Sequence, residues 1–292
     1  MKVLITGANG QLGSTFVRVL GDSNEVVGTV RHELDLANDV SVRAVVSEVR
    51  PDLIVNCAAY NEVDSAERHT ETALAVNAFG VQSLAVMASE CHSTLVHFST
   101  DFVFDGNTST PYSEADVPNP QSVYAASKLL GEWFAAQTPR HYVIRVESLF
   151  GGVASSNNRS RGSSLDLLAD ALLANETVRA FTDRFVSPSY VEDVAEATTQ
   201  ILTRELPSGL YHCVGSGSAS WFDIVTELAS RLGMDTPIQQ ITVENIDLPV
   251  KRPKFSALSN RKLASAGVVI PSWQDAVRRY AIERLKYIAK NC

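Results

Sequence analysis

The sequence predicts an α/β protein built on a doubly wound parallel sheet. Short apolar runs rich in β-branched residues alternate with longer stretches of helical period through the first half of the chain. The apolar runs lack a polar face, as expected for strands that helices cover on both sides. A glycine-containing turn directly follows the first run. At 292 residues the chain is also long enough to bury a large core.

The expected elements of this first half alternate between strand and helix. Right-handed crossovers between parallel strands place a ligand at the carboxyl ends of the strands. Strands are expected at residues 2–6, 25–30, 53–56, 94–99 and 142–146, and helices at residues 11–20, 39–49, 70–91 and 124–137.

The second half of the chain has a different pattern. Residues 151–164 are polar, rich in glycine and serine and without periodicity, which predicts a loop near a substrate. Strand patterns return at residues 178–181 and 209–214, and amphipathic helical patterns occupy residues 221–232 and 273–288. We therefore expect a smaller, mostly helical C-terminal lobe that is interleaved with the last strands.

Composition and charge argue against several classes of protein. The 25 basic and 33 acidic side chains give a net charge of −8, without a basic patch that would attract a nucleic-acid backbone. No run approaches the roughly 18 apolar residues of a membrane span. The four cysteines are far apart and the six histidines lack paired spacing, so no metal site is predicted. Because the N-terminus lacks a signal-peptide pattern, we expect a cytoplasmic protein without membrane or nucleic-acid partners.

The glycine turn predicts a dinucleotide site. Gly7, Gly10 and Gly13 follow the first strand, and Gln11 and Leu12 open the next helix. Glycines permit a tight turn and a close backbone approach, so that a pyrophosphate lies at the positive end of the helix. The expected organisation is a dinucleotide-binding Rossmann domain at residues 1–150, with strands returning near 178–215, and a substrate-binding lobe at residues 151–177 and 216–292.

The end of the second strand bears on the choice of dinucleotide. Arg31 stands where folds that use NAD usually place an acid, and its guanidinium suits a 2′-phosphate, which favours NADPH. Glu33 nearby leaves NADH open. Asp35 and Leu36 are expected beside the adenine ring. Small residues after the third strand, Ala58 among them, would let the backbone approach the adenosine and the pyrophosphate.

The candidate catalytic group combines Tyr124, Lys128 and Thr100. Tyrosine and lysine four residues apart share a helix face. An ammonium beside a phenol lowers its pKa towards the working range, so Tyr124 would donate a proton to a carbonyl oxygen as a hydride reaches the carbon. Lys128 would also bind the nicotinamide ribose, and the Thr100 hydroxyl, at the end of the fourth strand, would orient the substrate oxygen.

Together these motifs resemble the extended short-chain dehydrogenase/reductase superfamily and, within it, the dTDP-4-dehydrorhamnose reductase family. Its members reduce the C4 ketone of dTDP-4-dehydro-L-rhamnose. The resemblance implies that Tyr124 is the proton donor with Lys128 as its partner, and that Thr100 and Asp101 meet the sugar. It also implies cofactor contacts from Gly10, Gln11, Leu12, Asp35, Leu36, Ala59, Tyr60 and Asn61. The matching stretches cover most of the chain and are residues 7–13, 35–36, 50–56, 63–67, 99–106, 124–128, 187–195, 209–212 and 252–253.

Two departures from the family pattern affect what the resemblance implies. The family's Arg-Thr-Ser-Trp stretch, whose tryptophan packs against the substrate, is replaced here by Arg145-Val146-Glu147-Ser148. With Ser148 in place of the tryptophan, the identity of the sugar stays open. Thr15 stands where some members carry an acid that holds magnesium between two subunits, so no metal is predicted, although a homodimer remains open. We expect Arg252 to help hold the diphosphate of a nucleotide sugar.

Two alternative functions stay open. A sugar-nucleotide epimerase of the same superfamily would retain the Tyr124–Lys128 pair but keep its NAD bound and regenerate it. A non-catalytic NADP-binding regulatory subunit would retain many of the motifs without turnover, although the intact Thr100, Tyr124 and Lys128 favour catalysis. A dehydratase is disfavoured, because Phe102 fills the place of the acid that would protonate the leaving hydroxyl.

Overall fold

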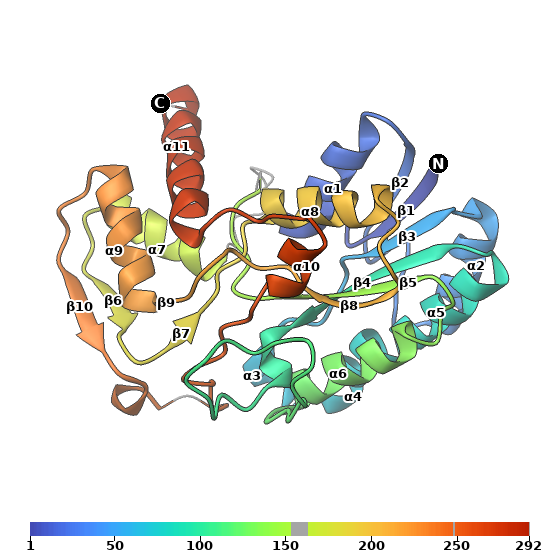
Figure 1. The fold of residues 1–292 in the computed structure, drawn as a ribbon, viewed down its shortest axis with the longest axis horizontal. Coiled ribbons are helices and arrows are strands. Elements are labelled where there is room, and N and C mark those ends of the chain that lie inside the picture. The colour runs from blue at the N-terminus through green and yellow to red at the C-terminus, as the bar shows by residue number, and fades with distance from the viewer. Residues whose placement is uncertain (153–162, 248, 292) are drawn as a thin grey trace.

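The larger lobe is built on a six-stranded parallel sheet (Figure 1). The structure is a computed structural model that describes residues 1–152, 163–247 and 249–291. The chain runs from β1 (Lys2–Thr6) to β2 (Glu25–Thr29) on one side of it, and then to β3 (Leu53–Asn56) on the other side. The direction in which strands are added therefore reverses between β1 and β3. Ligands of such sheets bind at the carboxyl ends of the strands beside this reversal. The strand order is β2 (Glu25–Thr29), β1 (Lys2–Thr6), β3 (Leu53–Asn56), β4 (Thr94–Thr100), β5 (His141–Val146) and β8 (Gly209–His212).

Helices cover both faces of this sheet, as predicted. On one face, α1 (Gln11–Gly21), α8 (Val191–Thr203) and the short α10 (Arg261–Ser265) contribute to a core around Phe16. On the other face, α2 (Asp39–Val49), α5 (Gly80–Glu90) and α6 (Val123–Ala135) enclose a second core around Leu84. The sequence thus forms the doubly wound α/β fold that its apolar strands predict.

The helix expected at residues 70–91 contains a wider turn. It consists of α4 (Thr70–Leu74), the π-helical turn η1 (Ala75–Phe79) and α5. By length and hydropathy, residues Thr70–Glu90 could span a membrane, but half of the window is buried within the protein. Insertions of this kind reorient side chains and are frequent at functional sites. In this protein, η1 directs Asn77 towards the loop after β3, as described below.

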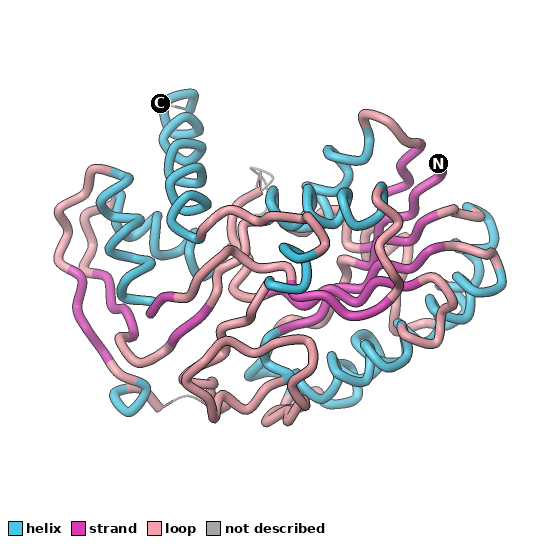
Figure 2. The backbone as a smooth tube through the Cα atoms, in the orientation of Figure 1, coloured by secondary structure: helices cyan, strands magenta, loops and turns pink. Residues whose placement is uncertain are grey.

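The smaller lobe is mostly helical and lies beside the carboxyl edge of the sheet (Figures 1 and 2). Its core contains Phe150, Leu228, Trp273 and Tyr280. Two short sheets complete it, one parallel and one antiparallel. Its elements are α7 (Ser164–Leu173), β6 (Val178–Phe181), β7 (Phe185–Val186), β9 (Ala219–Ser220), α9 (Trp221–Leu232), β10 (Ile238–Ile241) and α11 (Trp273–Asn291), while the short α3 (Val63–Ala66), η2 (Asp101–Val103) and η4 (Val243–Asn245) lie in connecting segments.

Two expectations for the second half need correction. Residues 178–181 do not return to the main sheet: β6 pairs with β10, whereas β8 does join β5. β6 alternates buried and exposed side chains, with Arg179 exposed, so it has one apolar face and does not fit a sheet covered on both sides. Residues 153–162 of the expected loop lie outside the described residues. At the end of the expected loop, Ser163 is the N-cap of α7 and forms a capping box with Asp166, so the helix begins at Ser164.

Candidate active site

The glycine turn connects β1 to α1 and packs against the segment that follows β3. Gly7 has a φ of +65°, which favours glycine, and a Cβ there would lie 2.9 Å from the backbone nitrogen of Ala58. A Cβ on Gly13 would lie 2.1 Å from the Gly7 carbonyl oxygen. Gly10 is exposed and supplies no side-chain cap to the first N–H groups of α1, which begins at Gln11. This cradle of glycines at an uncapped helix start fits a pyrophosphate.

The predicted adenosine side of the site lies at the end of β2. The Arg31 side chain is 76% exposed, and its Nε lies 4.0 Å from Oδ1 of the partly exposed Asp35. The side chains of Leu36 and Leu12 are instead packed in the two cores of the larger lobe. Leu36 is therefore placed where its side chain stabilises the fold, and Arg31 and Asp35 remain accessible to a ligand.

Asn77 holds the loop that follows β3. Its Oδ1 accepts the N–H of Tyr60 at 2.8 Å, and its Nδ2 donates to the Tyr60 carbonyl at 3.0 Å and to the Ser127 hydroxyl at 3.0 Å. Ala58, Ala59 and Tyr60 are partly buried in this loop, and Asn61 is exposed. The π-helical turn thus fixes the predicted cofactor loop to α6. Sequence periodicity gives no signal for this turn.

Gln11 connects the glycine turn with the smaller lobe. Its Nε2 donates to Oδ2 of Asp166 in α7 at 2.9 Å and to the carbonyl oxygen of Gly151 at 3.3 Å. Tyr280 of α11 donates to the other oxygen of Asp166 at 2.5 Å. A residue predicted to contact the cofactor therefore also contacts the lobe predicted to contact the substrate.

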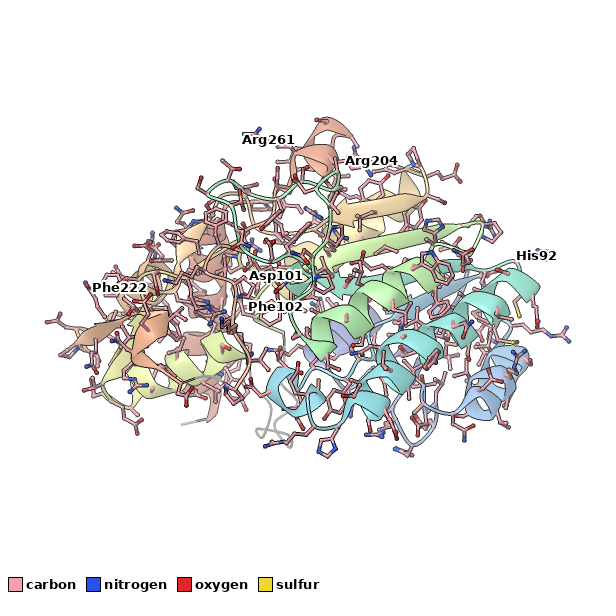
Figure 3. All side chains as sticks on the ribbon, turned by 90° about the horizontal axis from the view of Figure 1, so that it is seen from below. His92, Asp101, Phe102, Arg204, Phe222 and Arg261 are labelled. Carbon is pink, nitrogen blue, oxygen red and sulfur yellow. The ribbon has the colours of Figure 1, made fainter. Side chains whose placement is uncertain are left out.

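The structure brings the predicted catalytic residues together at the junction of the two lobes. Thr100 ends β4, and Tyr124 lies in the first turn of α6, where Ser122 caps the helix by accepting the N–H of Ala125 at 3.2 Å. A side-chain hydrogen bond joins Tyr124 to Thr100, and both residues are buried. Figure 3 shows the adjoining Asp101 between the lobes. A substrate carbonyl bound here would meet a hydroxyl and a phenol.

The expected effect of Lys128 on the phenol differs in the structure. Lys128 is buried, and its Nζ donates to the carbonyl oxygen of Phe98 at 2.6 Å. Burial lowers the pKa of Lys128 to about 8. Burial also raises the pKa of Tyr124 above its usual value, the charge of Asp101 raises it further, and only the hydrogen bond with Thr100 opposes this. Tyr124 is consequently a neutral phenol at pH 7, ready to donate a proton.

A buried carboxyl pair was not predicted from the sequence. Asp101 follows β4 and Glu147 follows β5, and a side-chain hydrogen bond joins their carboxyl groups. Burial is the main cause that raises the pKa of both residues, that of Asp101 to about 6. The signal for Glu147 was an acid directly after a buried strand, at the edge where ligands bind.

Ser148 and Arg252 both lie near this pair. Ser148 follows Glu147 and is partly exposed, with a φ of +45°, a conformation uncommon for residues other than glycine. Arg252 donates from Nη2 to Oδ2 of Asp64 at 2.8 Å, and its guanidinium lies 5.9 Å from the centre of the Phe102 ring. Arg252 is therefore already held by α3 next to the catalytic residues.

A pocket of about 280 Å³ lies in the smaller lobe. Nε of Arg184 and Nε1 of Trp221 are buried and lack a hydrogen-bond partner among the described residues. Buried donors without partners are rare in proteins, and a ligand acceptor is one explanation. The charge of Asp101 acts on Arg184, so this residue connects the pocket with the catalytic group. The pocket is lined by Ser164, Leu167, Leu168, Arg179, Ala180, Phe181, Arg184 and Trp221.

Comparisons with known proteins agree with this geometry. The family model described as the RmlD substrate binding domain matches residues 1–286. The chain is 32% identical over 296 residues to a dTDP-4-dehydrorhamnose reductase of Burkholderia thailandensis, covering 95% of this chain and 97% of the relative. It is 33% identical over 279 residues to a dTDP-4-keto-6-deoxy-D-glucose reductase of Streptomyces niveus, covering 94% of each.

Among solved structures, a dTDP-4-dehydrorhamnose reductase of Bacillus anthracis in complex with NADP has a TM-score of 0.90 to this chain. The two are 31% identical, and the match covers 97% of this chain and 99% of the other. The similarity therefore extends through both lobes. The family resemblance predicted from the motifs is confirmed, and this chain belongs to the RmlD substrate-binding domain family, together with the dTDP-4-dehydrorhamnose reductases.

Proposed function

We propose that this protein reduces the C4 ketone of a nucleotide-linked 4-keto-6-deoxy sugar, converting dTDP-4-dehydro-L-rhamnose to dTDP-L-rhamnose with NADPH. The observation that carries the proposal is the neutral, buried Tyr124 hydrogen-bonded to Thr100, at the strand edge that also holds the glycine turn. The names of the Burkholderia and Streptomyces relatives support a reductase of this class.

The chemistry follows from the protonation states of the site. When bound, the reduced nicotinamide supplies a hydride to the ketone carbon. Tyr124 donates its proton to the ketone oxygen, and Thr100 orients that oxygen by hydrogen bonding. Lys128, one turn after Tyr124 on α6, is held by the carbonyl of Phe98 and would bind the nicotinamide ribose. A phenol whose pKa lies above its usual value in the resting site suits the reductive direction, because the proton is present when the hydride arrives.

The cofactor proposal rests on the cradle and on Arg31. Backbone N–H groups of Gln11, Leu12 and Gly13 would hold the pyrophosphate, and the loop at residues 58–61 would border the adenosine. The exposed guanidinium of Arg31 is accessible to a 2′-phosphate. The NADP complex of the Bacillus anthracis protein supports this choice, while NADH remains a second cofactor to test.

The two lobes would bind different ligands, the larger lobe the cofactor and the smaller lobe the substrate. The larger lobe, residues 1–150 with β8, would bind the dinucleotide, and the smaller lobe would bind the nucleotide sugar. Thr100, Asp101 and Ser148 would contact the sugar, and Arg252 the diphosphate. In the pocket, the ring of Trp221 would stack on the base and Arg184 would donate to a phosphate or base oxygen.

The location and assembly of the protein follow from the same chemistry. A reductase that consumes NADPH and a nucleotide sugar is expected in the cytoplasm, and Cys57, Cys91 and Cys213 are free thiols, as a reducing compartment favours. We expect the enzyme to act on a small-molecule substrate, without nucleic acid or membrane, as a monomer or a homodimer.

The decisive experiment follows NADPH oxidation by the purified protein with dTDP-4-dehydro-L-rhamnose and a small panel of other 4-keto sugar nucleotides. We expect stoichiometric loss of NADPH and a reduced sugar product. An epimerase would instead interconvert sugars with tightly bound NAD and no net oxidation. Cofactor binding without turnover on the whole panel would favour a regulatory subunit and refute the reductase proposal.

A further inference from the structure

Asp101 and Glu147 place two carboxyl groups in contact inside the protein. Their exposed fractions are 4% and 1%. Oε1 of Glu147 accepts the hydroxyl of Ser256 at 2.6 Å, and Oε2 accepts the N–H of Ser187 at 2.7 Å. A side-chain hydrogen bond also joins Glu147 to Asp101. Because a hydrogen bond between two carboxyl groups needs a proton on one of them, the geometry calls for a protonated acid.

The surrounding charges do not provide an ion pair for either acid. Within residues 1–152, 163–247 and 249–291, no lysine or arginine forms a salt bridge with Asp101 or Glu147. The positive charge that faces the pair is Arg184, from the segment before β7. Arg252 and Asp183 act in turn on Arg184. Tyr124 faces it from α6. Two adjacent buried carboxylates repel each other, so ionisation of both is strongly disfavoured.

A chain of hydroxyl groups leads from this pair to the phenol. Oγ1 of Thr100 donates to Oδ1 of Asp101 at 3.0 Å, and a side-chain hydrogen bond joins Tyr124 to Thr100. Thr100 comes from β4, Asp101 from η2 and Tyr124 from α6, and Glu147 directly follows β5. All four side chains are buried. A hydroxyl that both donates and accepts can pass a proton between its two neighbours.

We propose that Asp101 and Glu147 share one proton and that this pair, acting through Thr100, returns a proton to Tyr124 during turnover. The inference rests on the proposed function, in which Tyr124 protonates the ketone. Glu147 does not touch the reacting atoms, so it is a positioning residue that acts through Asp101.

The proton transfers balance as follows. Tyr124 loses its proton to the ketone oxygen while the ketone carbon accepts a hydride from the reduced nicotinamide dinucleotide. The Thr100 hydroxyl, whose proton points to Oδ1 of Asp101 in the resting site, then turns and gives that proton to the phenolate of Tyr124. The Thr100 oxygen takes the proton shared by Asp101 and Glu147. The pair is left with two negative charges and regains one proton from water before the next turnover.

The protonation state is tested on the wild-type protein without turnover. Infrared spectroscopy at pH 7, with specific ¹³C labelling of aspartate and glutamate carboxyl groups, should show a protonated buried carboxyl group. The band should disappear in Glu147→Gln, in which the amide of glutamine can donate to an ionised Asp101. A wild-type spectrum at pH 7 in which every carboxyl group is ionised would overturn the proposal, whether or not any variant folds.

The kinetic test compares Glu147→Gln with Glu147→Asp and with a buried acid elsewhere. Glu147→Gln should lower kcat by about tenfold or more, below the roughly 10²–10⁴-fold effect of a direct general acid. KM should stay near the wild-type value, and the loss should deepen as pH rises. Glu147→Asp should restore part of kcat, because it restores the second acid. Asp193 of α8, which is paired with Arg279, supplies the control Asp193→Asn, whose pH profile should match the wild type.

The outcomes separate this inference from the proposed function. A Glu147→Gln variant with the wild-type kcat and pH profile, or one that loses activity equally at every pH, would overturn the proton-sharing pair. Such a result leaves Tyr124 untouched as the proton donor. Retention of turnover by Tyr124→Phe would refute the proposed function itself, whatever Glu147→Gln does.

Discussion

Arg145 binds Glu132 through two parallel hydrogen bonds, from Nε to Oε1 at 2.8 Å and from Nη2 to Oε2 at 2.7 Å. Both residues are buried, and the hydroxyl of Ser99 donates to the same Oε1 at 2.5 Å. The ion pair thus joins α6 to β4 and β5. Tyr124 and Lys128 lie two turns and one turn before Glu132 on the same face of α6. The pair therefore sets the position of both residues over the sheet edge.

Replacing Glu132 tests this role through stability. Glu132→Gln removes the negative charge and leaves the guanidinium of Arg145 buried without a counter-charge. We expect a loss of about 3–5 kcal/mol in the free energy of unfolding, as for other buried pairs that lose one partner. Urea denaturation followed by circular dichroism measures it. Asp39→Asn breaks the exposed Asp39–Arg43 pair of α2 and should cost far less; equal losses would show that burial of the Arg145 pair does not matter.

Replacing Tyr124 tests the proton donor. Tyr124→Phe keeps the ring and removes the hydroxyl, so turnover should fall by about 10²–10⁴-fold while NADPH binding is retained. Steady-state kinetics and a fluorescence titration with NADPH give the two values. Tyr142→Phe is a matched control, because the Tyr142 hydroxyl donates to the carbonyl of Leu206 in the connection before β8, away from the site. Activity close to wild type in Tyr124→Phe would contradict the mechanism.

Replacing Arg31 tests the choice of dinucleotide. The guanidinium is exposed at the end of β2, with Asp35 at 4.0 Å as its ion-pair partner. Arg31→Ala should weaken NADPH binding by about tenfold or more, the effect of losing a charge-assisted contact of 1.5–3 kcal/mol, and leave NADH binding nearly unchanged. Calorimetric titration of both dinucleotides measures the ratio. If NADPH and NADH weaken equally, Arg31 does not contact the 2′-phosphate.

Local patterns in the sequence were sufficient for the sheet and the glycine turn. The strands from β1 to β5 are short apolar runs bounded by turns, and Gly7 and Gly13 stand where a Cβ would collide with backbone. The contact of Asp101 with Glu147 was not predictable in this way. It depends on two strand ends meeting at one edge, and on Ser187 and Ser256 from the second half of the chain.

The burial and contacts of a residue were also harder to predict than the element on which it lies. Tyr124 and Lys128 do share a face of α6, but their pKa values depend on burial and on the carbonyl of Phe98, neither of which their spacing reveals. In the same way, the apolar pattern of β6 predicts a strand without identifying β10 as its partner. Long-range packing decides both outcomes.

The pH dependence of stability gives a test of Glu147 that needs no substrate. The pKa of Glu147 is raised well above its ordinary value of 4.5, mainly by burial and then by the charge of Asp101. The folded state therefore keeps a proton that the unfolded chain releases, and stability falls as pH rises above about 4.5, by about 1.4 kcal/mol for each unit between the two pKa values.

Glu147→Gln removes this titration. Relative to the variant, the wild type should lose stability as the pH rises above about 4.5, as measured by urea denaturation at matched ionic strength. The slope should flatten once the pH exceeds the folded pKa. A stability difference between the two proteins that does not change with pH would contradict the prediction. It would mean that Glu147 has the same protonation in the folded and unfolded chains, despite its burial against Asp101.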